Sequence, residues 1–275
     1  MREGEGPIAK RWAGEGITSA GRISRARIRA RNPSPYPLPQ GEGVKVLGLS
    51  DVELEAVRLS LRVAFWSVAC SLPFGLFVAW LLARRDFPGK ALLDGLVHLP
   101  LVVPPVVVGY LLLVLFGRRG PIGGLLHELF GVSLVFSWEG AALAAAVMAF
   151  PLMVRAMRLS LESVDRKLES AARTLGATPL DVFATVTLPM MAPGILVGAV
   201  LAFARGLGEF GATITFVSNI PGETRTIPVA IYTFTQAPGG EAAAMRLSLV
   251  SMAIALAALV ASEWLARRVR ARLRA

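Results

Sequence analysis

The sequence predicts an all-α protein that crosses a membrane several times. Of its 275 residues, 54% are hydrophobic and 17% are charged, and the mean hydropathy is +0.59. Apolar runs recur along most of the chain without the alternation of an amphipathic strand. Two of them, 63–83 and 95–117, hold no acid, Lys or Arg over about the 20 residues that a helix needs to cross a bilayer core. These observations favour a multi-span helical membrane protein over a soluble domain.

Residues 1–46 differ from everything that follows them. They are rich in Arg, Gly and Pro, end in "RNPSPYPLPQGEG" and show no amphipathic period. Such a composition is typical of a disordered segment. We expect a disordered basic extension here, with natural translation starting near 44–47, and a transmembrane domain over 47–275.

The apolar runs and the basic clusters together predict five spans and their orientation. If the C-terminus is cytoplasmic, most Lys and Arg that flank the spans lie inside, as the positive-inside rule requires. We therefore expect a chain embedded in membrane lipid, with its N-terminus outside and its C-terminus in the cytoplasm. The spans are expected at about 57–83, 95–117, 138–157, 190–216 and 243–265.

Several functions are disfavoured by the residues themselves. The net charge of +10 is spread in short clusters beside the apolar runs, so it indicates topology and not nucleic-acid binding. Cys70 is the one cysteine, and neither His98 nor His127 has a second metal ligand at a suitable spacing, so we expect no metal, no cofactor and no catalytic residue. "GLGEFG" at 206–211 spells a dinucleotide fingerprint but follows a membrane span and not a strand, and the chain has no Walker motif.

The longest loop that this topology places in the cytoplasm, 158–189, predicts a helical hairpin. "SLESVDRKLESAARTLG" has helical spacing and reaches Gly176, a residue typical of a helix C-terminus. Thr178 and Pro179 then fit the N-cap and first position of a second helix. The sequence "TLP" returns the chain to the bilayer.

The hairpin resembles the EAA loop of ABC importer permeases, through Ala171, Ala172, Gly176, Val186 and the pair Leu188 and Pro189. In that family the loop docks into a groove on the ATP-hydrolysing subunit. Counting back from Gly176, the acidic position of the family's loop falls on Ser170, with Glu169 one residue earlier. The docking candidates are Glu169, Ser170, Ala171, Ala172, Gly176, Ala177, Leu188 and Pro189.

Two longer segments are similar to the permease subunits of molybdate importers: "FPGKALLDGLVHLPLVVPPVVVGYLLL" and "ARGLGEFGATITFVSNIPGETRTIPVAIY". The resemblance covers about 47–270 and implies the type I ABC importer fold, with five transmembrane helices and a cytoplasmic coupling-helix hairpin. It implies a homodimer or a pair of similar chains in the bacterial inner membrane, two copies of a separate ABC ATPase subunit and an external molybdate-binding protein. Under this resemblance "SNIPGETRTIP", 218–228, is either a platform for that protein or a plain loop.

Other functions stay open beside molybdate import. Sulfate, tungstate or another oxyanion is the nearest alternative cargo. A membrane scaffold or sensor without transport is an alternative of a different class. An ion-driven secondary transporter is disfavoured because the sequence shows no inverted repeat.

Small residues recur every four positions in the fourth expected span and form one smooth helix face. Such faces let helices approach closely in lipid. The face fits packing within one subunit and a dimer seam equally well. Its residues are Gly194, Gly198, Ala202 and Gly206.

Charged residues and prolines within the spans are candidates for the transport pathway. Arg205 and Glu209 are four residues apart, so we expect them on one helix face, either lining a pathway, gate or subunit interface or forming a structural ion pair. Prolines in the second span break its hydrogen-bond ladder, which is typical either of cavity-lining helices in transporters or of a packing kink. The pathway or gate candidates are Pro100, Pro104, Pro105, Arg205, Glu209 and Thr213.

Overall fold

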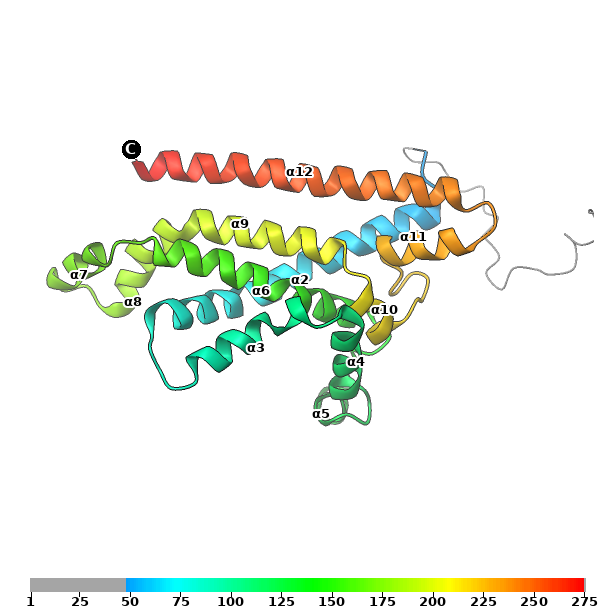
Figure 1. Cartoon of the computed structure of the whole chain (residues 1–275), viewed down its shortest axis with the longest axis horizontal. Coiled ribbons are helices and arrows are strands. Elements are labelled where there is room, and N and C mark those ends of the chain that lie inside the picture. Colours follow the sequence, from blue (N-terminus) through cyan, green and yellow to red (C-terminus); the bar gives the residue numbers. More distant parts are fainter. Residues whose placement is uncertain (1–47, 275) are drawn as a thin grey trace, which may run out of the picture. The chain divides into compact units, whose positions relative to one another are not determined.

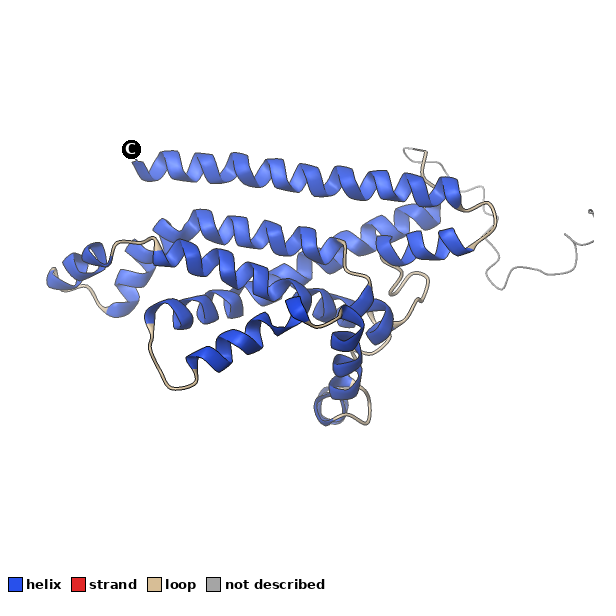
Figure 2. Ribbon diagram, viewed as in Figure 1, coloured by secondary structure: helices blue, strands red, loops and turns tan. Residues whose placement is uncertain are grey.

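The computed structural model describes residues 48–274, and within this range every regular element is a helix (Figures 1 and 2). The expectations for residues 1–46 lie outside the described range. Four of the described helices are long and apolar enough to cross a membrane, and a sharply bent pair brings the number of candidate spans to five. The expected all-helical, multi-span fold is confirmed.

The first span, α2 (Asp51–Arg84), begins at a capping box. The Ser50 hydroxyl accepts a hydrogen bond from the Glu53 N–H at 3.4 Å, and the Glu53 carboxylate accepts one from the Ser50 N–H at 2.6 Å. This reciprocal pair satisfies backbone donors that the first helical turn leaves free. The cap starts the helix several residues before the expected span at 57–83.

The second expected span, 95–117, is not one straight helix. It divides into α3 (Lys90–Val102) and α4 (Pro105–Phe116), which meet at an angle of 116°. Pro104 and Pro105 are both without an N–H, so the α-helical ladder cannot pass through them. A further short helix that was not expected, α5 (Pro121–Phe130), follows and ends at Gly131, whose φ is 67°.

The third span, α6 (Trp138–Glu162), lies at the centre of the packing. Its N-cap is Ser137, whose hydroxyl accepts a hydrogen bond from the Gly140 N–H. Most of the residues that it buries are Ala or Met, so neighbouring helices approach it closely. It contacts α2 and the span that follows it, and Figure 1 shows the three side by side.

The fourth expected span, 190–216, starts earlier and ends earlier than its hydropathy suggested. The hairpin helices α7 (Arg166–Thr174) and α8 (Pro179–Val182) lead through a π-helical turn, η1 (Phe183–Thr187), into α9 (Leu188–Leu207). The run from α8 to the end of α9 counts as one candidate span. The wider turn η1 comes just before Pro189, which cannot donate to the regular ladder.

The chain then leaves the helix at Gly208 and forms a separate short helix, α10 (Gly211–Val217). The continuous span that was expected up to residue 216 is therefore wrong. The break has a local cause, because Phe210 has non-helical backbone angles. The buried Glu209 side chain then accepts a hydrogen bond from the Ala212 N–H at 2.8 Å, and this contact caps the start of α10.

The last two helices are α11 (Ile227–Gln236) and α12 (Glu241–Arg274). Together with the start of α2 they form a hydrophobic cluster. Two polar contacts fix them to α2: the Ser60 hydroxyl accepts a hydrogen bond from the Ile227 N–H at 2.6 Å, and the fully buried Glu53 pairs with Arg246 at 2.9 Å.

The two interrupted segments of the chain pack against each other. A Cβ built on Gly109 of α4 would lie 2.6 Å from the Ala212 carbonyl oxygen of α10, and one built on Gly211 would lie 2.8 Å from Pro105. Only glycine allows this backbone approach. The sharp bend after α3 and the break before α10 therefore share one buried contact.

Replacing Gly109 with alanine should destabilise the protein by about 1–3 kcal/mol, because the added methyl overpacks the contact between α4 and α10. The free energy of unfolding, measured by denaturant titration in detergent micelles, checks this. Gly95→Ala is the matched control: it also lies in a helix, but nothing lies within 4 Å of its Cβ position, so it should be neutral or stabilising by up to about 1 kcal/mol. Equal effects of the two substitutions would contradict the close packing.

Candidate functional site

The hairpin between α6 and α9 is built by local capping signals. The Asp165 carboxylate caps α7 by accepting a hydrogen bond from the Lys167 N–H at 2.9 Å. After α7, Gly176 has φ of 90°, and its N–H donates to the Arg173 carbonyl at 3.0 Å. Thr178 and Asp181 then form the capping box of α8. The expected order of helix, glycine turn and second capped helix is what the structure contains.

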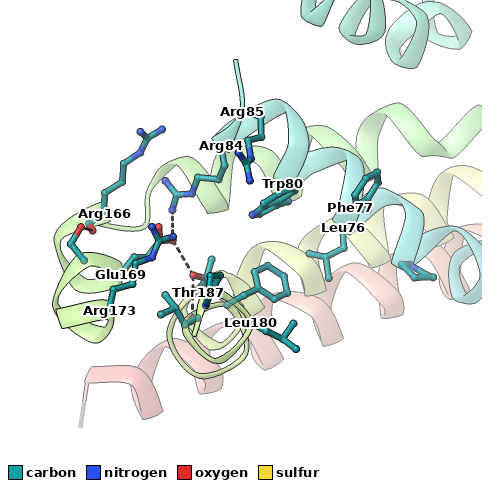
Figure 3. Close-up of a pocket in the computed structure, with 15 residues that line it drawn as sticks. Leu76, Phe77, Trp80, Arg84, Arg85, Arg166, Glu169, Arg173, Leu180 and Thr187 are labelled. Carbon is teal, nitrogen blue, oxygen red and sulfur yellow. Dashed lines mark hydrogen bonds and ion pairs between the residues drawn. The ribbon is translucent and has the colours of Figure 1, made fainter. Parts of the chain in front are cut away.

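A buried ion pair fastens this hairpin to the end of α2. Arg84 Nη2 lies 2.8 Å from Glu169 Oε1, and the two side chains are only 11% and 14% exposed. The same carboxylate oxygen accepts a hydrogen bond from the Thr187 hydroxyl at 2.9 Å. Glu169 thus joins three segments, α2, α7 and η1 (Figure 3).

The resemblance to the EAA loop places the acidic position at Ser170, one residue after Glu169. Ser170 is exposed, and its hydroxyl donates to the Arg166 carbonyl of its own helix. Glu169 therefore has the fixed ionic contact. Arg84 was not among the candidates because it precedes Glu169 by 85 residues, and nothing in the local sequence links the two.

The other docking candidates surround the bend of the hairpin. Ala171 and Gly176 are exposed, while Ala172 and Ala177 are half-buried, as are Leu188 and Pro189 at the start of α9.

Two large apolar side chains stand beside these small residues, Leu175 at 89% exposure and Leu180 at 75%. Neither was among the candidates. Their signal in the sequence is a leucine on each side of a glycine turn in a polar loop. Exposed leucines flanking small residues form a surface that another protein can cover.

A groove of about 850 Å³ opens between the end of α2 and the hairpin. We call it the boundary groove, and Figure 3 shows its labelled side chains converging from both elements. Its lining residues are Pro73, Leu76, Phe77, Trp80, Arg84, Arg85, Arg166, Glu169, Ser170, Arg173, Pro179, Leu180, Val182, Phe183 and Thr187.

The small-residue face of α9 packs within the chain. A Cβ on Gly194 would collide with the Ser160 side chain of α6, and one on Gly198 would lie 3.0 Å from the Met153 carbonyl oxygen. Gly206 faces Ser67 of α2, and Ala202 is buried. These contacts favour packing inside one subunit, the first of the two roles left open for this face.

The charged pathway candidates, Arg205 and Glu209, form an ion pair across the end of α9. They therefore do not lie on one continuous helix face. Arg205 Nη1 lies 2.6 Å from Glu209 Oε2, and the Glu209 side chain is 2% exposed. Its other oxygen accepts the Ala212 N–H. The pair therefore stabilises the turn into α10, where Thr213 is also buried.

The prolines of the second span separate into two groups. Pro105 contacts the start of α10 through Gly211, and Pro104 precedes it at the N-cap of α4. Pro100 lies inside α3 and faces an apolar hollow beside Cys70 and Phe150 instead. The structure thus brings Pro105 and the α10 candidates together and leaves Pro100 apart.

The loop before α11 is held by its own polar side chains. The Thr224 hydroxyl accepts a hydrogen bond from the Ile220 N–H at 2.8 Å, and Arg225 Nε donates to Asn219 at 2.9 Å. Asn219 in turn donates to Thr233 of α11. Burial lowers the pKa of the Arg225 guanidinium, while the Glu55 charge opposes this shift. The loop is therefore a fixed surface on the opposite end of α2 from the hairpin.

Comparison with known proteins identifies the class of this fold. Residues 71–271 match the family model of the binding-protein-dependent transport system inner membrane component. The chain thus belongs to that family, and it is a multi-pass inner-membrane transport component and not an enzyme.

Relatives and a solved structure agree with this assignment. The molybdenum transport system permease protein ModB of Escherichia coli (strain K12) is 67% identical over 82% of this chain and 98% of its own length. The sulfate transport system permease protein CysW of Synechococcus elongatus is 40% identical over 68% of this chain and 65% of its own length. A bacterial ABC transporter that imports alginate has a similar fold, with a TM-score of 0.65 at 19% identity over 81% of each chain.

The buried pair predicts a measurable coupling energy. In a double-mutant cycle of Arg84→Gln and Glu169→Gln, the two side chains should couple by about 1–3 kcal/mol, because removing either leaves the other charge largely buried without its partner. Free energies of unfolding in detergent micelles give the cycle. The exposed pair of Lys90 and Asp86 is the control and should couple by less than about 1 kcal/mol. Coupling no larger than in this control would show that the hairpin is not fastened here.

Proposed function

We propose that this chain is the transmembrane permease of an ATP-driven importer and that its cargo is molybdate. One observation carries the choice of cargo: the identity of 67% extends over 98% of a molybdenum permease, whereas a sulfate permease is 40% identical over 65% of its length. Sulfate or tungstate is the second candidate, because tetrahedral oxyanions share charge and shape. The membrane scaffold without transport has no observation in its favour.

The chain needs a separate source of energy. Its sequence has no Walker motif, so two copies of an ABC ATPase subunit would bind and hydrolyse ATP. The hairpin is the proposed docking element, since its bend exposes Leu175 and Leu180 beside Gly176. Burial of these leucines on the ATPase would contribute hydrophobic free energy to the docking.

The ion pair of Arg84 and Glu169 gives the docking element a mechanical connection. Closure of the two ATPase subunits would displace α7 and α8, and the pair would transmit that displacement to α2. The continuous run from α8 through η1 into α9 would carry it to the core helices. Alternating access would follow from this shared movement, with the break regions before α4 and α10 beside the pathway.

The assembly and its orientation are also part of the proposal. Two identical chains would form the pathway, with the hairpin and the C-terminus in the cytoplasm and the start of α2 outside. The distribution of Lys and Arg supports this orientation. The fixed loop before α11 would then face an external molybdate-binding protein.

Transport in a defined system tests this function. The permease, its ATPase and the external binding protein should be reconstituted in proteoliposomes and supplied with labelled molybdate, tungstate or sulfate. We expect ATP-dependent molybdate uptake and ATPase stimulation by the loaded binding protein. Sulfate uptake in preference to molybdate would overturn the cargo, and uptake without any ATPase would overturn the class of transporter.

Substitution of Gly176 should uncouple the permease. A β-branched valine is strained at φ of 90°, so Gly176→Val should distort the bend and lower both ATPase co-purification and molybdate uptake by at least about tenfold. Gly239→Val is the matched control, since Gly239 has φ of 79° and, like Gly176, nothing within 4 Å of its Cβ position. The control should keep both activities. Survival of both in Gly176→Val would refute the docking assignment.

A further inference from the structure

The boundary groove has an apolar wall at the membrane side. On α2, Phe77 is 59% exposed and lies with Leu76 and Trp80 along one side of the groove. Leu180 and Phe183 of the hairpin line the groove as well. Figure 3 shows Leu76 and Phe77 at one end and the hairpin arginines at the other. The groove is thus divided into an apolar part and a charged part.

The charged part carries more cations than acids. Four arginines line it, and the one acid among the lining residues is Glu169, which already pairs with Arg84. Arg85 lies over the Trp80 ring, 5.4 Å from its centroid. Within residues 48–274, no carboxylate forms an ion pair with Arg85, Arg166 or Arg173.

Among the described residues, two acids close in sequence to these arginines already form ion pairs with other side chains. Asp86, next to Arg85, forms its ion pair with Lys90 at 2.8 Å, and this hydrogen bond, with a smaller contribution from the Arg166 charge, lowers the pKa of the Asp86 carboxyl. Arg85, Arg166 and Arg173 are exposed. They therefore offer hydrogen-bond donors and positive charge to an anion in the groove.

We propose that the boundary groove binds an anionic phospholipid, with its phosphate among Arg85, Arg166 and Arg173 and an acyl chain along Phe77 and Leu76. The order of the lining matches such a molecule, because the apolar wall belongs to the membrane-spanning α2 and the arginines begin where that helix ends. Basic pockets at the ends of transmembrane helices are suited to anionic headgroups. Guanidinium groups bind phosphate oxygens through paired, charge-assisted hydrogen bonds. A volume of about 850 Å³ is within the usual range of about 300–1,000 Å³ for ligand sites.

Such a lipid would act on the coupling element. Its phosphate would contact α2 through Arg85 and the hairpin through Arg166 and Arg173, the same two segments that the Arg84 and Glu169 pair connects. Binding would therefore hold the hairpin against the membrane boundary. This inference goes beyond the proposed transport function and does not depend on which oxyanion is carried.

Native mass spectrometry of the detergent-purified complex of permease and ATPase tests the proposal, with phosphatidylglycerol and phosphatidylcholine added at equal concentrations. We expect the wild-type complex to retain phosphatidylglycerol preferentially. Arg85→Gln combined with Arg173→Gln should weaken this retention about 10- to 30-fold, since each arginine near a headgroup contributes a similar share of the attraction. Arg118→Gln combined with Arg119→Gln, an exposed pair outside the groove, removes the same charge and should retain the lipid.

Arg173 lies in the hairpin, so its substitution could also weaken binding of the ATPase subunit. A second variant without this change separates the two effects. Arg85→Gln alone leaves the hairpin sequence unchanged, since Arg85 directly follows α2, and should weaken phosphatidylglycerol retention about fivefold or more. Three results would overturn the proposal: equal retention of the two lipids by the wild type, equal retention in the groove and control variants, or displacement of the lipid by millimolar inorganic phosphate. A fourth result, a wild-type complex that retains neither lipid, would also overturn it, as expected if the ATPase subunit covers the groove.

Discussion

A bilayer supplies no water to an interrupted helix, so every break in this fold must be covered by protein. Two breaks, at Pro104 and between Gly208 and Phe210, cover each other. Gly109 and Gly211 allow the backbones of α4 and α10 to approach each other closely, and the Glu209 carboxylate accepts a hydrogen bond from the Ala212 N–H. The charges of Arg205 and Glu209 stabilise the second break. An acid that caps a helix and pairs with an arginine costs less free energy in a membrane than an isolated acid does.

A second set of buried contacts connects the hairpin to the core helices. A loop that joined α7 to α9 freely would transmit little movement. Here the chain enters the membrane as a continuous helical run from Pro179, and Glu169 binds both Arg84 and Thr187. Because these groups are largely buried, their separation would leave uncompensated charge. We therefore expect a displacement of the hairpin to reach α2 and α9 together.

Local signals made much of this architecture predictable from the sequence. Apolar runs predicted five spans, and the described residues contain four to five candidates. Gly176, Thr178 and Pro179 predicted the hairpin, because capping and turn preferences act over a few residues. The break at Gly208 was missed because hydropathy averages over about 20 residues and does not register a turn inside an apolar run. The contact of Arg84 with Glu169, and the boundary groove, depend on segments 85 residues apart, which no local pattern connects.

The glycine face of α9 shows how packing within the chain limits where a partner can bind. Its small residues are in contact with α6 and α2, and Gly198, Ala202 and Gly206 are buried, whereas Gly194 is half-buried. The large apolar side chains that remain exposed lie elsewhere, among them Phe74 of α2, Val102 of α3, Tyr110 of α4 and Met252 of α12. Lipid covers such surfaces at no hydrophobic cost, so association there must rest on shape and polar contacts. The small residues thus allow close helix packing within one subunit, and the large exposed side chains form the apolar surface that lipid or another chain contacts.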